Sequence, residues 1–184
     1  MKYLFWICLL SPFYFQAQHT ETERCLTLYE KYRKEKKYDS VVIVCKQLMQ
    51  QDRKISREYH LDYELADAAF KSGNYELAVK QSKKFLPNFY IPAQAHRNRQ
   101  CFQKNMHCKT LCSQLADYYA QTGNLSKEYH YLSLMFHKFN AAPCGTGRQV
   151  WRNTVYQRMI DCSNRMGRTK RAERLEKKLE KHTK

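Results

Sequence analysis

The feature that most constrains the fold is a stretch of eleven residues that occurs twice, at 65–75 and at 115–125. The two copies share Leu, Ala, Asp, Gly and Asn at equivalent positions. Internal repetition of this kind usually indicates stacked copies of one supersecondary unit, because a single unit cannot bury its apolar face alone. The second position of each copy, Ala66 or Ala116, leaves room for two helices to approach closely. We therefore expect an all-α chain built from repeated hairpins.

The end of each copy predicts a helix, a tight turn and a second helix. Gly73 and Gly123 stand where a helix must end, since glycine adopts the left-handed conformation without steric cost. Asn74 and Asn124 follow directly, and Asn is among the best N-caps for a following helix. Apolar or small residues then recur with helical spacing: Ala78, Ser82 and Phe85 after the first turn, and Tyr129, Leu132 and Phe136 after the second.

The same pattern extends over most of the chain as about four hairpins, near 22–50, 59–86, 109–138 and 153–182. In the first hairpin, Lys36-Lys37-Tyr38 stands in the place of the Gly-Asn-Tyr turn. The segment Val41–Val44 alone would suggest a strand, because β-branched residues favour extended chain. Its place in the repeat favours a helix instead.

Prolines and glycines mark the two long connections. Pro87 and Pro92 are expected to end the second hairpin and to open a longer loop. Pro143, Gly145 and Gly147 mark another loop before the fourth hairpin. The last helix is highly charged, and we expect it to close the stack with a polar outer face, as terminal repeats must.

This pattern resembles the tetratricopeptide repeat, a helix–turn–helix unit of about 34 residues. The Leu-Ala pairs, the three turn glycines, Tyr38 and Tyr75, and Ala78 and Ala172 fall on the signature positions of that family. The signature Trp is missing from every copy, and Gly73 and Gly123 are farther apart than one unit. The resemblance implies a right-handed solenoid of degraded repeats with a concave binding face, and a protein-binding role rather than catalysis.

An acidic residue recurs two positions after the start of each repeated phrase, and the resemblance implies that this position faces the concave groove. These carboxylates could receive a basic or amide-rich partner segment. Alternatively, each acid stabilises its own helix by about 0.2–0.5 kcal/mol through a partner four residues later. Both interpretations stay open for the acids and their partners: Glu30 and Lys34, Asp67 and Lys71, Asp117 and Gln121, and Asp161 and Arg165.

A basic segment between residues 80 and 109 contains no acid and is interleaved with aromatic residues and His. The whole chain has a formal net charge of +16, which favours anionic partners without choosing among them. Bases mixed with aromatic rings suit phosphate contacts and stacking, so this segment could bind nucleic acid, acidic glycans or lipid head groups. It could equally be a solvated basic loop. Its Lys and Arg residues are Lys80, Lys83, Lys84, Arg97, Arg99, Lys104 and Lys109.

The N-terminal stretch, residues 1–17, predicts a secretory signal peptide of bacterial type. Lys2 precedes an apolar run from Tyr3 to Phe15, and Ala17 supplies a small residue near a cleavage position. No Cys follows a small-residue lipobox, so we expect a secreted or periplasmic protein; a retained N-terminal anchor is the alternative. Since no second apolar stretch approaches membrane length, we expect no membrane span in the mature chain, residues 18–184.

Removal of Cys8 with the leader leaves seven cysteines, so at least one must be free or paired between chains. In an oxidising compartment, disulfides are the first expectation. Candidates lie beside the long connections, where the backbone can adjust: Cys144 paired with Cys101 or with Cys108, in preference to Cys25 with Cys45. No Cys-x-x-Cys is present, which argues against a metal site and a thiol oxidoreductase.

The sequence contains no His-Glu-x-x-His, Gly-x-Ser-x-Gly or phosphate-binding glycine loop. We therefore expect no enzyme, no cofactor and no metal. The expected function is an exported binding or scaffolding module whose concave face recognises a protein or peptide. The alternative is a polyanion-binding protein that uses the basic segment 80–109. Neither the partner nor the oligomeric state follows from the sequence.

Overall fold

The structure is a computed structural model that describes residues 20–89, 99–139 and 146–183. The predicted signal peptide and Cys144 lie outside these residues. Within them the regular structure is entirely helical and no strand is present, which confirms the all-α class. None of the described helices is both long and apolar enough to cross a membrane. The chain divides into two compact units, Met1–Ser82 and Lys83–Lys184, and each is described by itself below.

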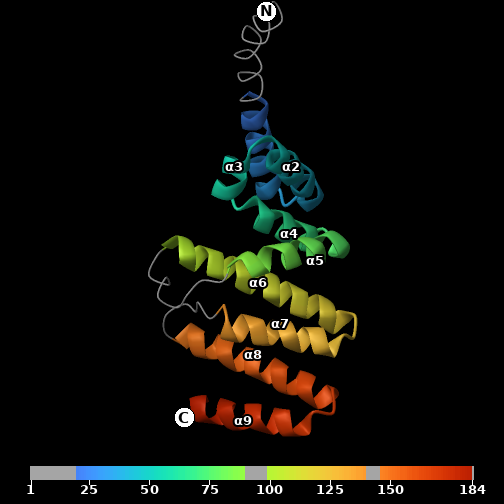
Figure 1. The fold of residues 1–184 in the computed structure, drawn as a ribbon, viewed down its shortest axis with the longest axis vertical. Helices are drawn as coiled ribbons and strands as arrows, with labels where there is room; N and C mark the ends of the chain where they lie inside the picture. The colour runs from blue at the N-terminus through green and yellow to red at the C-terminus, as the bar shows by residue number, and fades with distance from the viewer. Residues whose placement is uncertain (1–19, 90–98, 140–145, 184) are drawn as a thin grey trace, which may run out of the picture. The chain divides into compact units, whose positions relative to one another are not determined.

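The first unit begins with a helix over residues 20–34, followed by four further helical segments. The segment Val41–Val44 lies inside one of them, as the repeat pattern predicted. Helix α4 packs against α2, and the short α3 contacts both (Figure 1). The segments are α2 (Tyr38–Gln51), α3 (Arg53–Glu58), α4 (Leu61–Lys71) and α5 (Tyr75–Phe85), of which α5 runs across the unit boundary.

A single apolar cluster holds the first unit together. Leu48, Cys45 and Leu61 are fully buried in it. Tyr29 from the first helix also lies there, and its ring meets that of Tyr59 edge to face at 6.3 Å between centroids. Burial of such side chains stabilises the fold by about 1.5–3 kcal/mol each. The helices are therefore held together by side chains from all parts of the unit, not by neighbours along the chain alone.

The second unit is a succession of helices in which each long helix packs on the next one along the chain (Figure 1). It starts with a 3₁₀ turn, η1 (Leu86–Phe89), which contacts α6. The long helices are α6 (Arg99–Gln121), α7 (Leu125–His137), α8 (Thr146–Arg165) and α9 (Thr169–Thr183). The predicted hairpins 109–138 and 153–182 correspond to the pairs α6–α7 and α8–α9.

Two predicted boundaries in this unit are wrong. Helix α6 begins at Arg99, ten residues before the predicted hairpin, so part of the expected basic loop is helical. Gly147 lies in the first turn of α8 rather than in a loop. The Lys and Arg residues at the start of α6 favour a helix, and the single glycine in α8 is tolerated once the helix packs against its neighbours.

The turns that the sequence predicted are present with the expected geometry. Gly73, Gly123 and Gly167 have φ angles of 79°, 72° and 70°. A Cβ atom added at any of them would meet no described heavy atom within 4 Å, so the left-handed backbone alone requires glycine. The side chains of Asn74 and Asn124 cap the next helices by accepting hydrogen bonds from the amides three residues later, at 3.3 and 3.2 Å.

The first hairpin closes with the same turn although it has no glycine. Lys36 takes the left-handed position with φ 56°. The amide of Lys37 donates to the carbonyl of Tyr32 at 2.9 Å, as Asn124 does to Tyr119 at 2.8 Å. This 6→1 hydrogen bond defines the Schellman motif at a helix C-terminus. The first hairpin therefore has the same turn geometry as the hairpins that contain glycine.

Helix α3 was not predicted. Its N-cap is Asp52, whose carboxylate accepts hydrogen bonds from the amides of Lys54 and Ile55 at 2.6 and 3.3 Å. His60 then adopts a left-handed conformation, φ 51°, before α4 begins. The connection between the first two hairpins is thus ordered by a side-chain cap.

Candidate functional site

The recurring acids differ in their burial and in their contacts. Glu30 is exposed, whereas Asp67 is buried and pairs with Lys71 one turn along α4. This pair is the local helix interaction that was the alternative to a binding role. The Lys71 ammonium also lies 5.3 Å from the centre of the Tyr38 ring, so it has contacts within its own unit on two sides.

In the second unit the acids pair across helices or along one helix. Asp117 of α6 forms an ion pair with Arg158 of α8 at 2.8 Å. The partner that the sequence predicted for it was Gln121. Asp161 accepts a hydrogen bond from Gln157, also on α8, at 3.0 Å. A partner segment would therefore have to compete with these internal contacts.

Arg158 also joins a buried carboxylate that the sequence did not single out. Glu128 of α7 is 5% exposed and lies 3.4 Å from Arg158 and 3.9 Å from Arg165. The three residues and Asp117 connect α6, α7 and α8 in one network of alternating charge. Glu128 carried no recognisable signal, because a glutamate in the first turn of a helix is common on exposed surfaces as well.

A related pair lies in the first unit. Glu64 of α4 is 8% exposed and lies 3.2 Å from Arg33. Burial raises the pKa of Glu64, and the charge of Arg33 opposes that rise. Burial likewise raises the pKa of the neighbouring Tyr29, with the Glu64 charge adding to the effect. Glu64 and Tyr29 are buried in the core, whereas the Arg33 side chain is 59% exposed.

The described bases of the segment 80–109 differ in the unit to which they belong and in their exposure. Lys80 belongs to the first unit and is exposed, as are Lys83 and Lys84 of the second. Lys104 is half-buried. Arg97 lies outside the described residues, and Arg99 begins α6.

Lys109 is buried, contrary to its predicted place on a basic surface. It is 9% exposed, and its ammonium lies 3.6 Å from the centre of the Trp151 ring. Burial lowers the pKa of Lys109. A lysine held over an indole face in this way connects α6 to α8 through side chains and is withdrawn from solvent. It cannot contact a polyanion on the surface.

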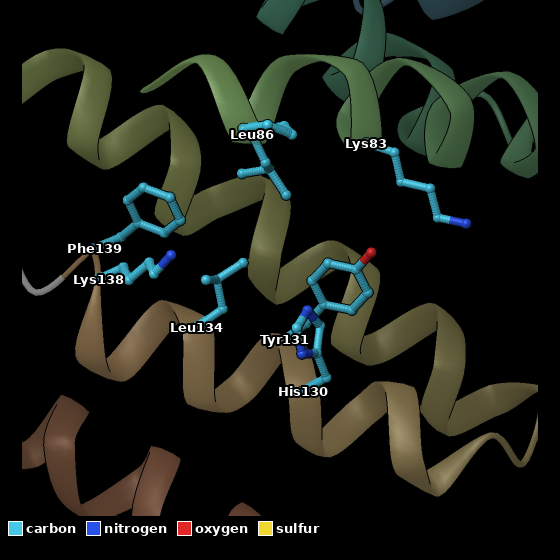
Figure 2. A pocket seen from close by; sticks show the side chains of 8 residues that line it. Lys83, Leu86, His130, Tyr131, Leu134, Lys138 and Phe139 are labelled. Atoms are coloured by element: carbon cyan, nitrogen blue, oxygen red, sulfur yellow. The ribbon is translucent and has the colours of Figure 1, made fainter. Parts of the chain in front are cut away.

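A pocket of about 380 Å³ lies on the second unit, where η1 faces α7 (Figure 2). Leu86 and Phe139 form apolar walls, and both are nearly fully buried. Leu134 of α7 lies between Phe139 and Tyr131 in Figure 2. The complete lining is Lys83, Leu86, Pro87, His130, Tyr131, Leu134, Lys138 and Phe139, all from the second unit.

The polar groups of this pocket are cationic or hydrogen-bond donors. Lys83 and Lys138 are exposed at its edge, and none of the eight described lining residues is acidic. Burial raises the pKa of Tyr131 to about 12, so its hydroxyl stays protonated and can donate a hydrogen bond. Its ring is fixed by stacking on Tyr119, with 5.7 Å between centroids. The arrangement can hold an apolar group and an anion side by side.

Sequence reasoning found only one residue of this pocket, Lys83. Leu86 and Pro87 come from η1. The remaining lining residues come from α7 and from the two positions after it, more than forty positions later in the chain than Lys83. A signal was present in the basic-aromatic spacing of His130, Tyr131 and Lys138 on the helix that follows Gly123. It is shared by many ordinary helices and did not distinguish this one.

The cysteines provide neither a metal site nor a disulfide among the described residues. Cys25, Cys45, Cys108, Cys112 and Cys162 are buried free thiols. The described side chains contain no group of three or more His, Cys, Asp or Glu that could hold a metal ion. Cys144 and the side chain of Cys101 lie outside the described residues, so a Cys101–Cys144 bridge stays a prediction, whereas Cys108 is a free thiol rather than the predicted partner of Cys144.

Compared with protein-family models, curated proteins and solved structures, the chain matches none of them.

Proposed function

We propose that the chain is an exported helical-repeat module that binds a protein or peptide partner, with its hairpins stacked in the manner of degraded tetratricopeptide repeats. The observation that supports this function best is the pocket between η1 and α7. It combines buried apolar walls with exposed lysines and no described acid. Recognition pockets in proteins combine an apolar lining with a few convergent polar groups in this way.

The proposed contact surface differs from the acid ladder that the resemblance implied. Asp67, Asp117 and Asp161 are engaged by partners inside their own units. Displacing an internal partner costs binding energy, so the engaged acids are a less favourable contact surface. We therefore assign the main contact to the pocket, and the ladder to the stability of the helices.

The test is site-specific photocross-linking in the cells that export the protein. A photoreactive phenylalanine replaces Leu134 in the pocket, and a control chain carries it at Val150, an exposed position on α8. We expect a discrete protein adduct from position 134 alone, and its loss when Lys83 and Lys138 are both replaced by Glu. Identical adducts from both positions, or an adduct indifferent to the double substitution, would contradict the proposal.

Polyanion binding is the alternative, and the exposed lysines Lys83 and Lys84 together with the net charge of +16 favour it. Binding of heparin or nucleic acid should weaken steeply as salt increases, because counterions are released from the polyanion. A Lys83→Ala/Lys84→Ala variant should then show a shallower dependence on salt. A peptide bound in the pocket should show only a small dependence, so one salt titration separates the two functions.

A further inference from the structure

We infer that the pocket selects a segment of a partner protein that joins a carboxylate to a large apolar side chain. The inference rests on the proposed function and names the chemistry of its ligand. Two properties of the lining carry it: the apolar walls and the set of donors around them.

The apolar part of the pocket calls for a bulky hydrocarbon group. Leu86 comes from η1 and Leu134 from α7, and Phe139 lies two positions after the end of α7. Leu86 and Phe139 are 7% and 4% exposed, so the neighbouring helices hold them in place. A volume of about 380 Å³ lies at the small end of the range for ligand pockets, which suits one or two side chains.

The donors of the pocket call for an anion next to that group. Figure 2 shows the Lys138 ammonium directed toward the space between Leu86 and Leu134, and the Tyr131 hydroxyl on the side nearer Lys83. A carboxylate accepts several hydrogen bonds and pairs well with ammonium groups. Partial removal of water by the apolar walls strengthens such a pair relative to the open surface.

The size and openness of the pocket favour a peptide over other anions. Lys83, Pro87 and Lys138 are exposed, so the site is a surface pocket rather than an enclosed tunnel for a long acyl chain. Lys109 is buried, so it cannot contribute to the extended row of bases that a polyanion needs. A short acidic and apolar segment satisfies both parts of the lining at once.

The experiment uses the full chain and three fluorescein-labelled peptides in fluorescence anisotropy. The first peptide contains Glu-Leu-Phe between Gly-Ser flanks, the second has Gln in place of Glu, and the third has Ser in place of Leu and Phe. We expect the first to bind and the second to bind about tenfold more weakly, as the loss of a charge-assisted hydrogen bond predicts. The third should show no measurable binding.

Two double variants with the same change in charge assign the effect to the pocket. Lys83→Gln/Lys138→Gln should abolish the difference between the Glu and Gln peptides. Lys177→Gln/Lys178→Gln removes equal charge from exposed positions on α9 and should leave the difference unchanged. Circular dichroism of each variant verifies that it is folded.

The outcomes separate this inference from the proposed function. Equal binding of the Glu and Gln peptides would overturn the choice of an anion, while leaving a peptide pocket in place. Displacement of the Glu peptide by a fatty acid or by heparin at lower concentration than by unlabelled peptide would overturn the choice of a peptide. Absence of binding by all three peptides would overturn the inference, and the photocross-linking at Leu134 would still decide the function.

Discussion

Lys36 should be the position at which one substitution stabilises this protein most simply. It is exposed and has φ 56°, in the left-handed position that Gly73, Gly123 and Gly167 occupy in the other three hairpins. A side chain with a Cβ in this conformation costs about 1–2 kcal/mol. Replacing Lys36 by Gly removes that cost without removing a buried contact.

Part of this gain is lost through the unfolded chain. Glycine makes the unfolded state more flexible, which lowers stability by about 0.4–1 kcal/mol. The net expectation for Lys36→Gly is therefore an increase of about 0.5–1 kcal/mol in the free energy of unfolding. In a unit of this size, such an increase raises Tm by about 4 °C. Gly123→Ala should have an effect of similar size and opposite sign, since its φ is 72°.

Thermal and urea unfolding measured by far-ultraviolet circular dichroism provide the assay. Trp151 is the only tryptophan after the predicted leader and lies in the second unit, so its fluorescence follows Gly123→Ala separately. Lys37→Gly is the control, because Lys37 has φ −83° and gains nothing from glycine. It should destabilise the first unit.

The reasoning fails if Lys36→Gly lowers Tm by as much as Lys37→Gly does. That result would mean that the first hairpin does not close with the left-handed turn. An increase in Tm caused by Gly123→Ala would also refute the argument.

Four further predictions concern the core and its buried charges. Ala116→Phe should overpack the contact of a fully buried residue and cost about 1–3 kcal/mol, seen as a lower Tm; an unchanged Tm would contradict the repeat alignment. Arg158→Met should cost about 3 kcal/mol in urea unfolding, because it leaves the buried Glu128 without its nearer cation, and Glu128→Gln in the same chain should restore part of the loss. Burial raises the pKa of Glu64 above its ordinary value of 4.5, so the folded protein holds this proton more tightly than the unfolded chain does. The free energy of unfolding of wild type, relative to that of Glu64→Gln, should therefore rise as pH falls from neutral toward 4.5. A difference between the two proteins that does not change with pH would contradict this prediction. Burial raises the pKa of Cys45 to about 12, so mass spectrometry should find this thiol unmodified by iodoacetamide in the folded protein and modified after unfolding.

Local features of the chain could be predicted because they depend on residues close together in sequence. The left-handed glycines and the Asn caps follow from the backbone geometry of single residues, and all of them appear as expected. The helix at Val41–Val44 followed from the repeat, although its composition favours strand. The all-α class follows from these same signals.

The ends of the longer helices could not be predicted, since they depend on packing. Lys and Arg are good helix formers and glycine is a poor one, but neighbouring helices determine whether the helix continues through them. For this reason α6 extends back to Arg99 and α8 contains Gly147.

The candidate site belongs entirely to the tertiary structure. The sequence alone predicted a basic, helical chain, but it assigned Lys109 to a charged surface where the fold buries it against Trp151. Lys83 meets His130 and Lys138 in one pocket only because the end of α5 and η1 lie opposite α7. Glu128 is held by Arg158, thirty residues later, because α7 packs against α8. Turn and cap geometry is set by residues within about five positions of one another, whereas burial and charge pairing are set by which helices pack together.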